Sequence, residues 1–87
     1  MIGKVTRFFK NKSVAGIELK KPLKVGDKIR IFSKPNPNTG KPRIDFIQIV
    51  TSMEIEHQQI KEANPGDSVG LKVDQEVKEG CYCILEP

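Results

Sequence analysis

The stretch PGDSVGLKV, residues 65–73, does most to decide the fold of this chain. Its first part is a turn, because proline fixes its own φ and the following glycine supplies the positive φ that tight turns need. Its second part, residues 69–73, alternates apolar residues with glycine and lysine, which is the period of a β-strand. The stretch LKVGDKIRI, residues 23–31, has the same order of a Gly-Asp turn and an alternating strand. Two such units predict an all-β protein.

Working outward from these units, the rest of the chain divides into further short strands. The six predicted strands are Ile2–Phe9, Val14–Leu19, Lys28–Phe32, Ile44–Glu56, Val69–Val73 and Cys81–Leu85. In the longest, alternation places Ile47, Ile49, Met53 and Ile55 on one face, and Gln48, Ser52, Glu54 and Glu56 on the other. We therefore expect the isoleucines to face the core and Gln48 to face away from it.

The segments between these strands show little regular structure. Gln58–Ala63 has room for one helical turn at most, because Pro65-Gly66 stops it. The loop Lys34–Arg43 holds three prolines, two asparagines and a glycine, a composition typical of irregular structure. Six short strands without a convincing helix predict a small closed or nearly closed β-barrel, since closure removes exposed edges. We expect one domain over residues 1–87.

Charge is unevenly distributed along the chain, although the net charge is only +4. Residues 1–43 hold 12 Lys or Arg and 2 Asp or Glu, a net of +10, whereas residues 44–87 hold 3 and 9, a net of −6. If the fold keeps these halves apart, one side is a basic field suited to phosphates. If strands from both halves interleave, as in a barrel, the asymmetry largely cancels. The sequence leaves both arrangements open.

The sequence predicts neither a catalytic centre nor a metal or cofactor site. Cys81 and Cys83 are too close in sequence for an unstrained disulfide, and no second pair completes a zinc ligand set. With His57 as the single histidine, no nucleophile–base arrangement is indicated. Glu54 and Glu56 lie on one strand face about 7 Å apart, without a pocket to raise a pKa. We expect reduced thiols, a cytoplasmic location and no membrane span.

The Gly-Asp stretches also carry a resemblance to a known family. LKVGDKIRI, residues 23–31, resembles the "hGDxhxI" segment in the second domain of translation elongation GTPases. VTSMEIEHQQIKEANPGDSVGLKV, residues 50–73, is similar to that family's next signature, and VKEGCYCI, residues 77–84, looks like its closing strand. The resemblance extends to stand-alone elongation-factor-like proteins and to a barrel at the C-terminus of some U32 family peptidases. It implies a six-stranded Greek-key barrel of the translation-factor domain II type that contacts RNA or the ribosome.

The features that bind GTP in this family are missing from the sequence. No G-x-x-x-x-G-K-[ST] phosphate loop is present. Residues 11–14, NKSV, resemble the guanine-reading N-K-x-D motif, but Val14 stands where the aspartate is required. We therefore expect no GTP binding and no enzymatic activity, so that any role in translation is a binding role.

The resemblance also implies a role for two residues near the Pro-Gly-Asp turn. In elongation factor Tu, a glutamate and, three residues later, an arginine lie beside the 3′-terminal adenosine of aminoacyl-tRNA. Counting back from Gly66 without gaps, these positions are Glu54 and His57. Glu54 lies on the outward strand face and can point at a partner, while His57 replaces the arginine. The alternative is that Glu54 is an ordinary solvated strand residue.

Basic residues of the N-terminal half provide further candidate RNA contacts. Lys and Arg neutralise phosphates, and exposed rings stack on bases. Phe8 and Phe9 face opposite ways in a strand, so that one of them can be exposed. The candidate RNA-binding residues are Arg7, Lys10, Lys12, Lys28, Arg30, Lys34, Lys41, Arg43, Glu54 and His57. The alternative is that the lysines only confer solubility.

The sequence therefore predicts a non-catalytic RNA- or ribosome-binding β-barrel module, with tRNA or rRNA as the RNA partner. A second hypothesis is a protein-interaction or accessory module that acts with a separately encoded U32-type or RNA-modifying enzyme. The acidic C-terminal half and the similar barrel in U32 family peptidases motivate this alternative.

Overall fold

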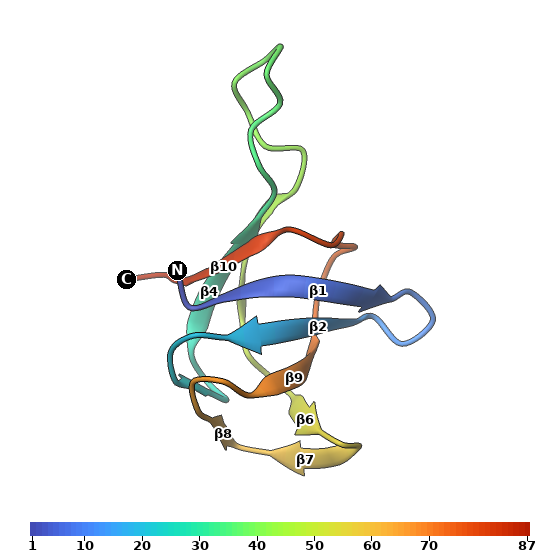
Figure 1. The fold of residues 1–87 in the computed structure, drawn as a ribbon, viewed down its shortest axis with the longest axis vertical. Helices are drawn as coiled ribbons and strands as arrows, with labels where there is room; N and C mark the ends of the chain where they lie inside the picture. The colour runs from blue at the N-terminus through green and yellow to red at the C-terminus, as the bar shows by residue number, and fades with distance from the viewer.

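The structure, a computed structural model, describes residues 1–87 and consists of β-strands and connecting loops. The ten strands are β1 (Gly3–Phe9), β2 (Val14–Leu19), β3 (Leu23–Lys24), β4 (Lys28–Phe32), β5 (Asp45–Ile49), β6 (Met53–Ile55), β7 (Gln58–Ile60), β8 (Glu62–Ala63), β9 (Ser68–Lys72) and β10 (Tyr82–Leu85). Eight form one curled sheet in the order β5-β4-β10-β1-β2-β9-β6-β7, and β3 pairs with β8 (Figure 1). The predicted small all-β barrel is confirmed. The chain has no helix that could cross a membrane.

The strands number ten rather than six because one predicted strand divides in two and three short strands, β3, β7 and β8, form outside the predicted ones. The segment 44–56 divides into β5 and β6, with residues 50–52 between them. The single helical turn considered for Gln58–Ala63 is wrong, since these residues form β7 and β8. The hairpin from β6 to β7 turns at Glu56 and His57, whose φ angles are 50° and 65°. Two successive positive φ values are typical of a type I′ hairpin turn.

The two Gly-Asp turns have the same construction and are joined by the β3–β8 pair. The Asp27 carboxylate accepts a hydrogen bond from the backbone N–H of Lys24 at 2.9 Å. The Asp67 carboxylate accepts one from the N–H of Asn64 at 2.8 Å. Because β3 and β8 run antiparallel, the turns that lead into β4 and β9 are related by an approximate twofold arrangement.

One core of 18 buried apolar residues fills the barrel. The alternation predicted for β2, β4 and β9 is confirmed. Their buried residues are Ala15, Ile17 and Leu19 in β2, Ile29 and Ile31 in β4, and Val69 and Leu71 in β9. These side chains point inward because every second residue of a strand faces the same side.

Strand β5 has the opposite register to the predicted one. Ile47 and Ile49 are 49% and 47% exposed, whereas Gln48 is only 5% exposed. The amide of Gln48 connects β5 to the end of β9, a contact that we call the seam of the barrel. Nε2 donates to the carbonyl of Lys72 at 2.9 Å, and Oε1 accepts from the N–H of Asp74 at 2.8 Å. The prediction failed because these hydrogen bonds make a buried polar side chain acceptable.

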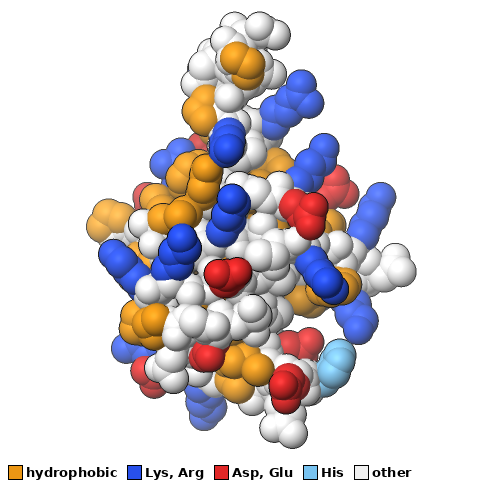
Figure 2. All heavy atoms as spheres, in the orientation of Figure 1, with side chains coloured by type: hydrophobic (Ala, Val, Ile, Leu, Met, Phe, Trp, Pro, Cys, Tyr) orange, Lys and Arg blue, Asp and Glu red, His pale blue; other side chains and the backbone are white.

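The strands of the basic and acidic halves of the chain interleave. β10 lies between β4 and β1, and β9 lies beside β2. Figure 2 shows Lys and Arg side chains spread over one face of the molecule, with Asp and Glu side chains among them. Of the two arrangements that the sequence left open, the interleaved one is found.

Candidate functional site

A shallow hollow of about 190 Å³ brings together three of the predicted RNA-binding residues, Lys12, Glu54 and His57. Phe9, which is 45% exposed, also contributes to its lining. Gly70 forms part of the hollow, and a methyl group added to it would come within 3.3 Å of Cγ of Glu54. The hollow therefore combines an exposed ring, a cation and two carboxylates, those of Glu54 and Glu56, around a glycine that has no side chain to fill the space.

The carboxylate of Glu54 is only lightly engaged within the protein. Nε2 of Gln59 donates to it at 3.5 Å, a distance at which hydrogen bonds are weak. Gln59 is itself held by Ser52, whose hydroxyl donates to Oε1 of Gln59 at 3.0 Å. The outward direction predicted for Glu54 agrees with its half-buried position beside this hollow.

Five other candidate residues lie outside the lining of this hollow. Arg7 and Lys10 are exposed near the hairpin from β1 to β2. Lys34, Lys41 and Arg43 belong to the loop between β4 and β5, which projects from the barrel at the top of Figure 1. The structure thus distributes the basic candidates over several surfaces rather than one.

The outer face of β10, β4 and β5 carries apolar and aromatic side chains in register. We call it the outer sheet face; it consists of Arg30, Phe32, Asp45, Ile47, Ile49 and Tyr82. Cross-strand pairing places Tyr82 opposite Phe32, and Arg30 opposite Ile47. The rings of Phe32 and Tyr82 have centroids 5.7 Å apart and planes tilted by 46°, within the favourable range for aromatic pairs. The sequence did not identify this face, because it assigned the isoleucines to the core.

Arg30 is engaged within this face. Its Nε and Nη2 atoms each donate to one carboxylate oxygen of Asp45 at 2.7 Å, and its guanidinium carbon lies 5.0 Å from the ring centroid of Phe32. The hydrogen bond with Arg30 lowers the pKa of Asp45, and the same bond raises the pKa of Arg30. Much of the Arg30 charge is therefore compensated, while Lys28, the remaining candidate, is exposed on the same strand.

Both cysteines are free thiols in the core. Burial raises the pKa of Cys83 to about 12, so that very little of this thiol is ionised at neutral pH. No three His, Cys, Asp or Glu side chains come together as metal ligands.

The strands and their single core define a small β-barrel. Its fold matches the C-terminal domain of a Geobacillus thermoleovorans protein provisionally assigned to the U32 peptidases, with a TM-score of 0.83. That match covers 100% of this chain and 92% of the domain at 18% identity. The selenomethionine variant of the same domain matches with a TM-score of 0.78 at 18% identity, covering 94% of each chain. At this identity the match shows the fold alone.

A relative is also found by sequence. The chain is 42% identical over 79 residues to an uncharacterised protease of Methanocaldococcus jannaschii. The matched region covers 91% of this chain but only 18% of the length of that protease. No family model matches the chain. The resemblance to elongation-factor domain II stays a prediction.

Proposed function

We propose that this chain is a non-catalytic accessory module that binds a U32-type enzyme through the outer sheet face. The observation that carries the proposal is the exposure of Ile47 and Ile49, which are 49% and 47% accessible beside the Phe32–Tyr82 pair. Apolar side chains grouped on a surface are typical of protein interaction sites. The 42% identity to about a fifth of a protease supports an enzyme as the partner.

The composition of the face agrees with this role. Aromatic residues and arginine are enriched where proteins meet, and they provide most of the binding energy when a partner excludes water from them. The Asp45 carboxylate holds Arg30 in place with two hydrogen bonds, so that little side-chain freedom remains to be lost on binding. Lys28 lies at the edge of the face and would form part of a polar rim.

The test is a binding measurement between the purified chain and the U32-type enzyme of the same organism, by isothermal titration calorimetry. We expect the double variant Ile47→Ser, Ile49→Ser to bind at least about tenfold more weakly, a loss of about 1.4 kcal/mol. Val25→Ser is the matched control, because Val25 is 40% exposed and lies outside the face. Absence of binding by the wild type, or equal weakening by the control, would refute the proposal.

RNA binding is the second candidate function, favoured by the hollow that Phe9, Lys12, Glu54 and His57 line. An exposed ring can stack on a base, and a lysine can contact a phosphate. The resemblance to elongation-factor domain II supports the end of a tRNA as the ligand, with rRNA or the ribosome as the wider setting.

The RNA hypothesis is tested by NMR titration of the ¹⁵N-labelled protein with unfractionated tRNA at low and at physiological salt. Shifts at Phe9, Lys12 and 54–57 that persist at physiological salt would support it. Shifts spread over every basic residue and abolished by salt would show a generic electrostatic contact instead.

We further propose that the chain acts as one module in the cytoplasm, in keeping with its two free thiols.

A further inference from the structure

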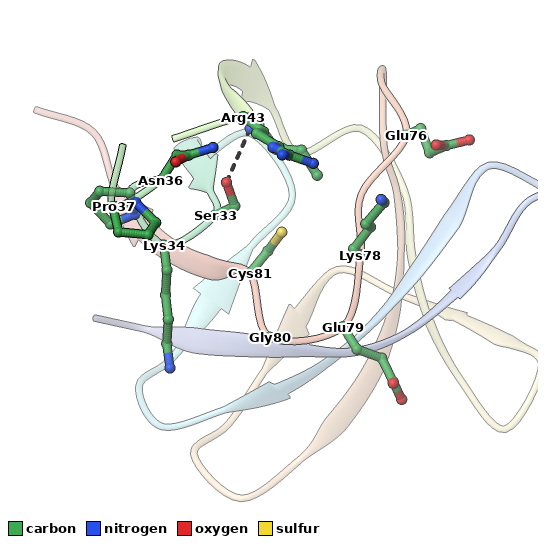
Figure 3. Close-up of a pocket in the computed structure, with 12 residues that line it drawn as sticks. Ser33, Lys34, Asn36, Pro37, Arg43, Glu76, Lys78, Glu79, Gly80 and Cys81 are labelled. Atoms are coloured by element: carbon green, nitrogen blue, oxygen red, sulfur yellow. Dashed lines mark hydrogen bonds between the residues drawn. The ribbon is translucent and has the colours of Figure 1, made fainter. Parts of the chain in front are cut away.

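A larger hollow, of about 600 Å³, lies between the projecting loop and the segment that leads into β10 (Figure 3). One wall comes from residues 33–37 and 43–44, and the other from residue 76 and residues 78–81. Neither the outer sheet face nor the smaller hollow contributes a residue to it. Its chemistry can therefore be considered independently of both.

Two cations face each other across this hollow. Figure 3 shows Arg43 and Lys78 extending toward it from its two walls, whereas the carboxylates of Glu76 and Glu79 point away. Neither cation forms a salt bridge, since the one salt bridge of the chain lies on the outer sheet face. Two unpaired cations that converge on one space favour an anionic ligand.

The base of the hollow is apolar. Cys81 is 1% exposed and its thiol points into the space, and Ile44 and Pro35 also line it. No aromatic side chain lines the hollow. A site for single-stranded nucleic acid normally offers rings for bases to stack on, so that this lining favours an aliphatic group as the neighbour of the anion.

The loop that forms the first wall is held in a defined shape. The N–H of Asn36 donates to the carbonyl of Lys41 at 2.8 Å, and Pro35 and Pro42 form a β-bridge. Within the tip, Oδ1 of Asn36 accepts from the N–H of Asn38 at 2.8 Å. The wall is therefore formed before any ligand binds, as is usual for specific pockets.

We propose that this hollow binds a carboxylate of a polypeptide together with an adjacent aliphatic side chain. Arg43 and Lys78 hold the carboxylate, Arg43 through its paired N–H donors, and the aliphatic group lies over Cys81 and Ile44. Two groups of a polypeptide can supply this carboxylate: its C-terminus, or the side chain of an internal Glu or Asp. The site goes beyond the proposed docking of an enzyme, and either can fail without the other.

The test is fluorescence anisotropy with three labelled peptides. The first ends in Gly-Ala-Val with a free carboxylate, the second is its C-terminal amide, and the third is an amide with an internal Glu-Val. We expect the double variant Arg43→Gln, Lys78→Gln to weaken binding of the carboxylate peptides at least about tenfold. The matched control Lys41→Gln, Lys61→Gln removes the same charge from residues outside the hollow and should change binding less than about twofold.

Each outcome decides the proposal. Binding of the free-carboxylate peptide alone supports a chain terminus as ligand, and binding of the internal Glu peptide supports an acidic side chain. Equal binding of the uncharged amide, or equal weakening by the control variant, overturns the proposal. Tighter binding of a uridine decamer at physiological salt, lost in the Arg43→Gln, Lys78→Gln variant, also overturns it in favour of RNA. Urea unfolding verifies that both variants, which change exposed residues, remain folded.

Discussion

Gln48 occupies a position where a strand of this barrel would ordinarily carry an apolar residue. It is 5% exposed, and both ends of its amide bond to the chain segment at residues 72–74. No buried side-chain nitrogen or oxygen of the protein lacks a hydrogen-bond partner. A single side chain thus substitutes for backbone pairing between β5 and the end of β9.

Replacing Gln48 by leucine should destabilise the protein. The change leaves the carbonyl of Lys72 and the N–H of Asp74 without these partners, and loss of such bonds costs about 1–3 kcal/mol of unfolding free energy. Equilibrium urea unfolding measures this loss. Gln58→Leu, at an exposed position of β7, is the matched control and should stay within about 0.5 kcal/mol of the wild type. Similar values for the two variants would show that the seam contributes little.

The ion pair of Asp45 makes stability depend on pH in the acidic range. Arg30 lowers the folded-state pKa of Asp45 below the ordinary value of 3.8, so that the folded protein favours the ionised form. Its contribution is therefore present above about pH 4 and is lost as the pH falls through the lowered folded-state pKa. Urea midpoints measured from about pH 2 to about pH 5 should fall less in Asp45→Asn and in Arg30→Gln than in the wild type. Parallel curves for all three proteins would exclude this contribution.

Among the elements, the two Gly-Asp turns demand glycine for the same reason. Gly26 has a φ of 101° and Gly66 a φ of 92°, while neither has an atom within 4 Å of an added methyl group. Backbone conformation, rather than space, is what excludes another residue.

Alanine at either turn should therefore carry a similar penalty. We expect Gly26→Ala and Gly66→Ala each to lose about 1–2 kcal/mol of unfolding free energy. Gly16→Ala is the control, because its φ lies outside the strained range and its nearest contact would be 3.4 Å. If only one of the two substitutions lowers the unfolding free energy, the two Gly-Asp turns do not contribute equally to the stability of the barrel.

The sequence pattern predicted some of the strands and turns correctly and others incorrectly. The turns and the strands β2, β4 and β9 were predictable, because every second residue of each strand is apolar, while the residues between them are mostly polar or glycine. In residues 46–50, FIQIV, four of five residues are apolar, so that either register satisfies alternation and the polar Gln48 favoured the wrong one. The β6–β7 turn uses Glu56 and His57 without the Asn-Gly pair that usually marks it.

The candidate sites were predictable only in part for a different reason. Alternation gave the outward direction of Glu54, but its proximity to Phe9 and Lys12 depends on how two distant hairpins pack. Likewise, Arg43 and Lys78 come together only through the position of β10 between β4 and β1. No local pattern encodes such long-range pairing.

For the molecule as a whole, the two core thiols report on global unfolding. Cys81 and Cys83 are 1% and 0% exposed, and burial raises the pKa of Cys83 to about 12, so that this thiol holds almost no reactive thiolate at neutral pH. We expect a thiol reagent to modify both cysteines together, at a rate that rises with urea in step with unfolding. Rapid modification of the native protein would reveal a local opening of β10 instead.

The first and last strands lie side by side, with the N–H of Ile2 donating to the carbonyl of Cys83 at 2.9 Å (Figure 1). Joining these neighbouring ends by a few residues and opening the chain at the exposed tip of the projecting loop would give a circular permutant with the same strand pairing. The same geometry suits the barrel to insertion within a surface loop of another protein. The inserted chain would enter and leave the barrel at nearly one point, so that the two ends of the host loop would stay close together.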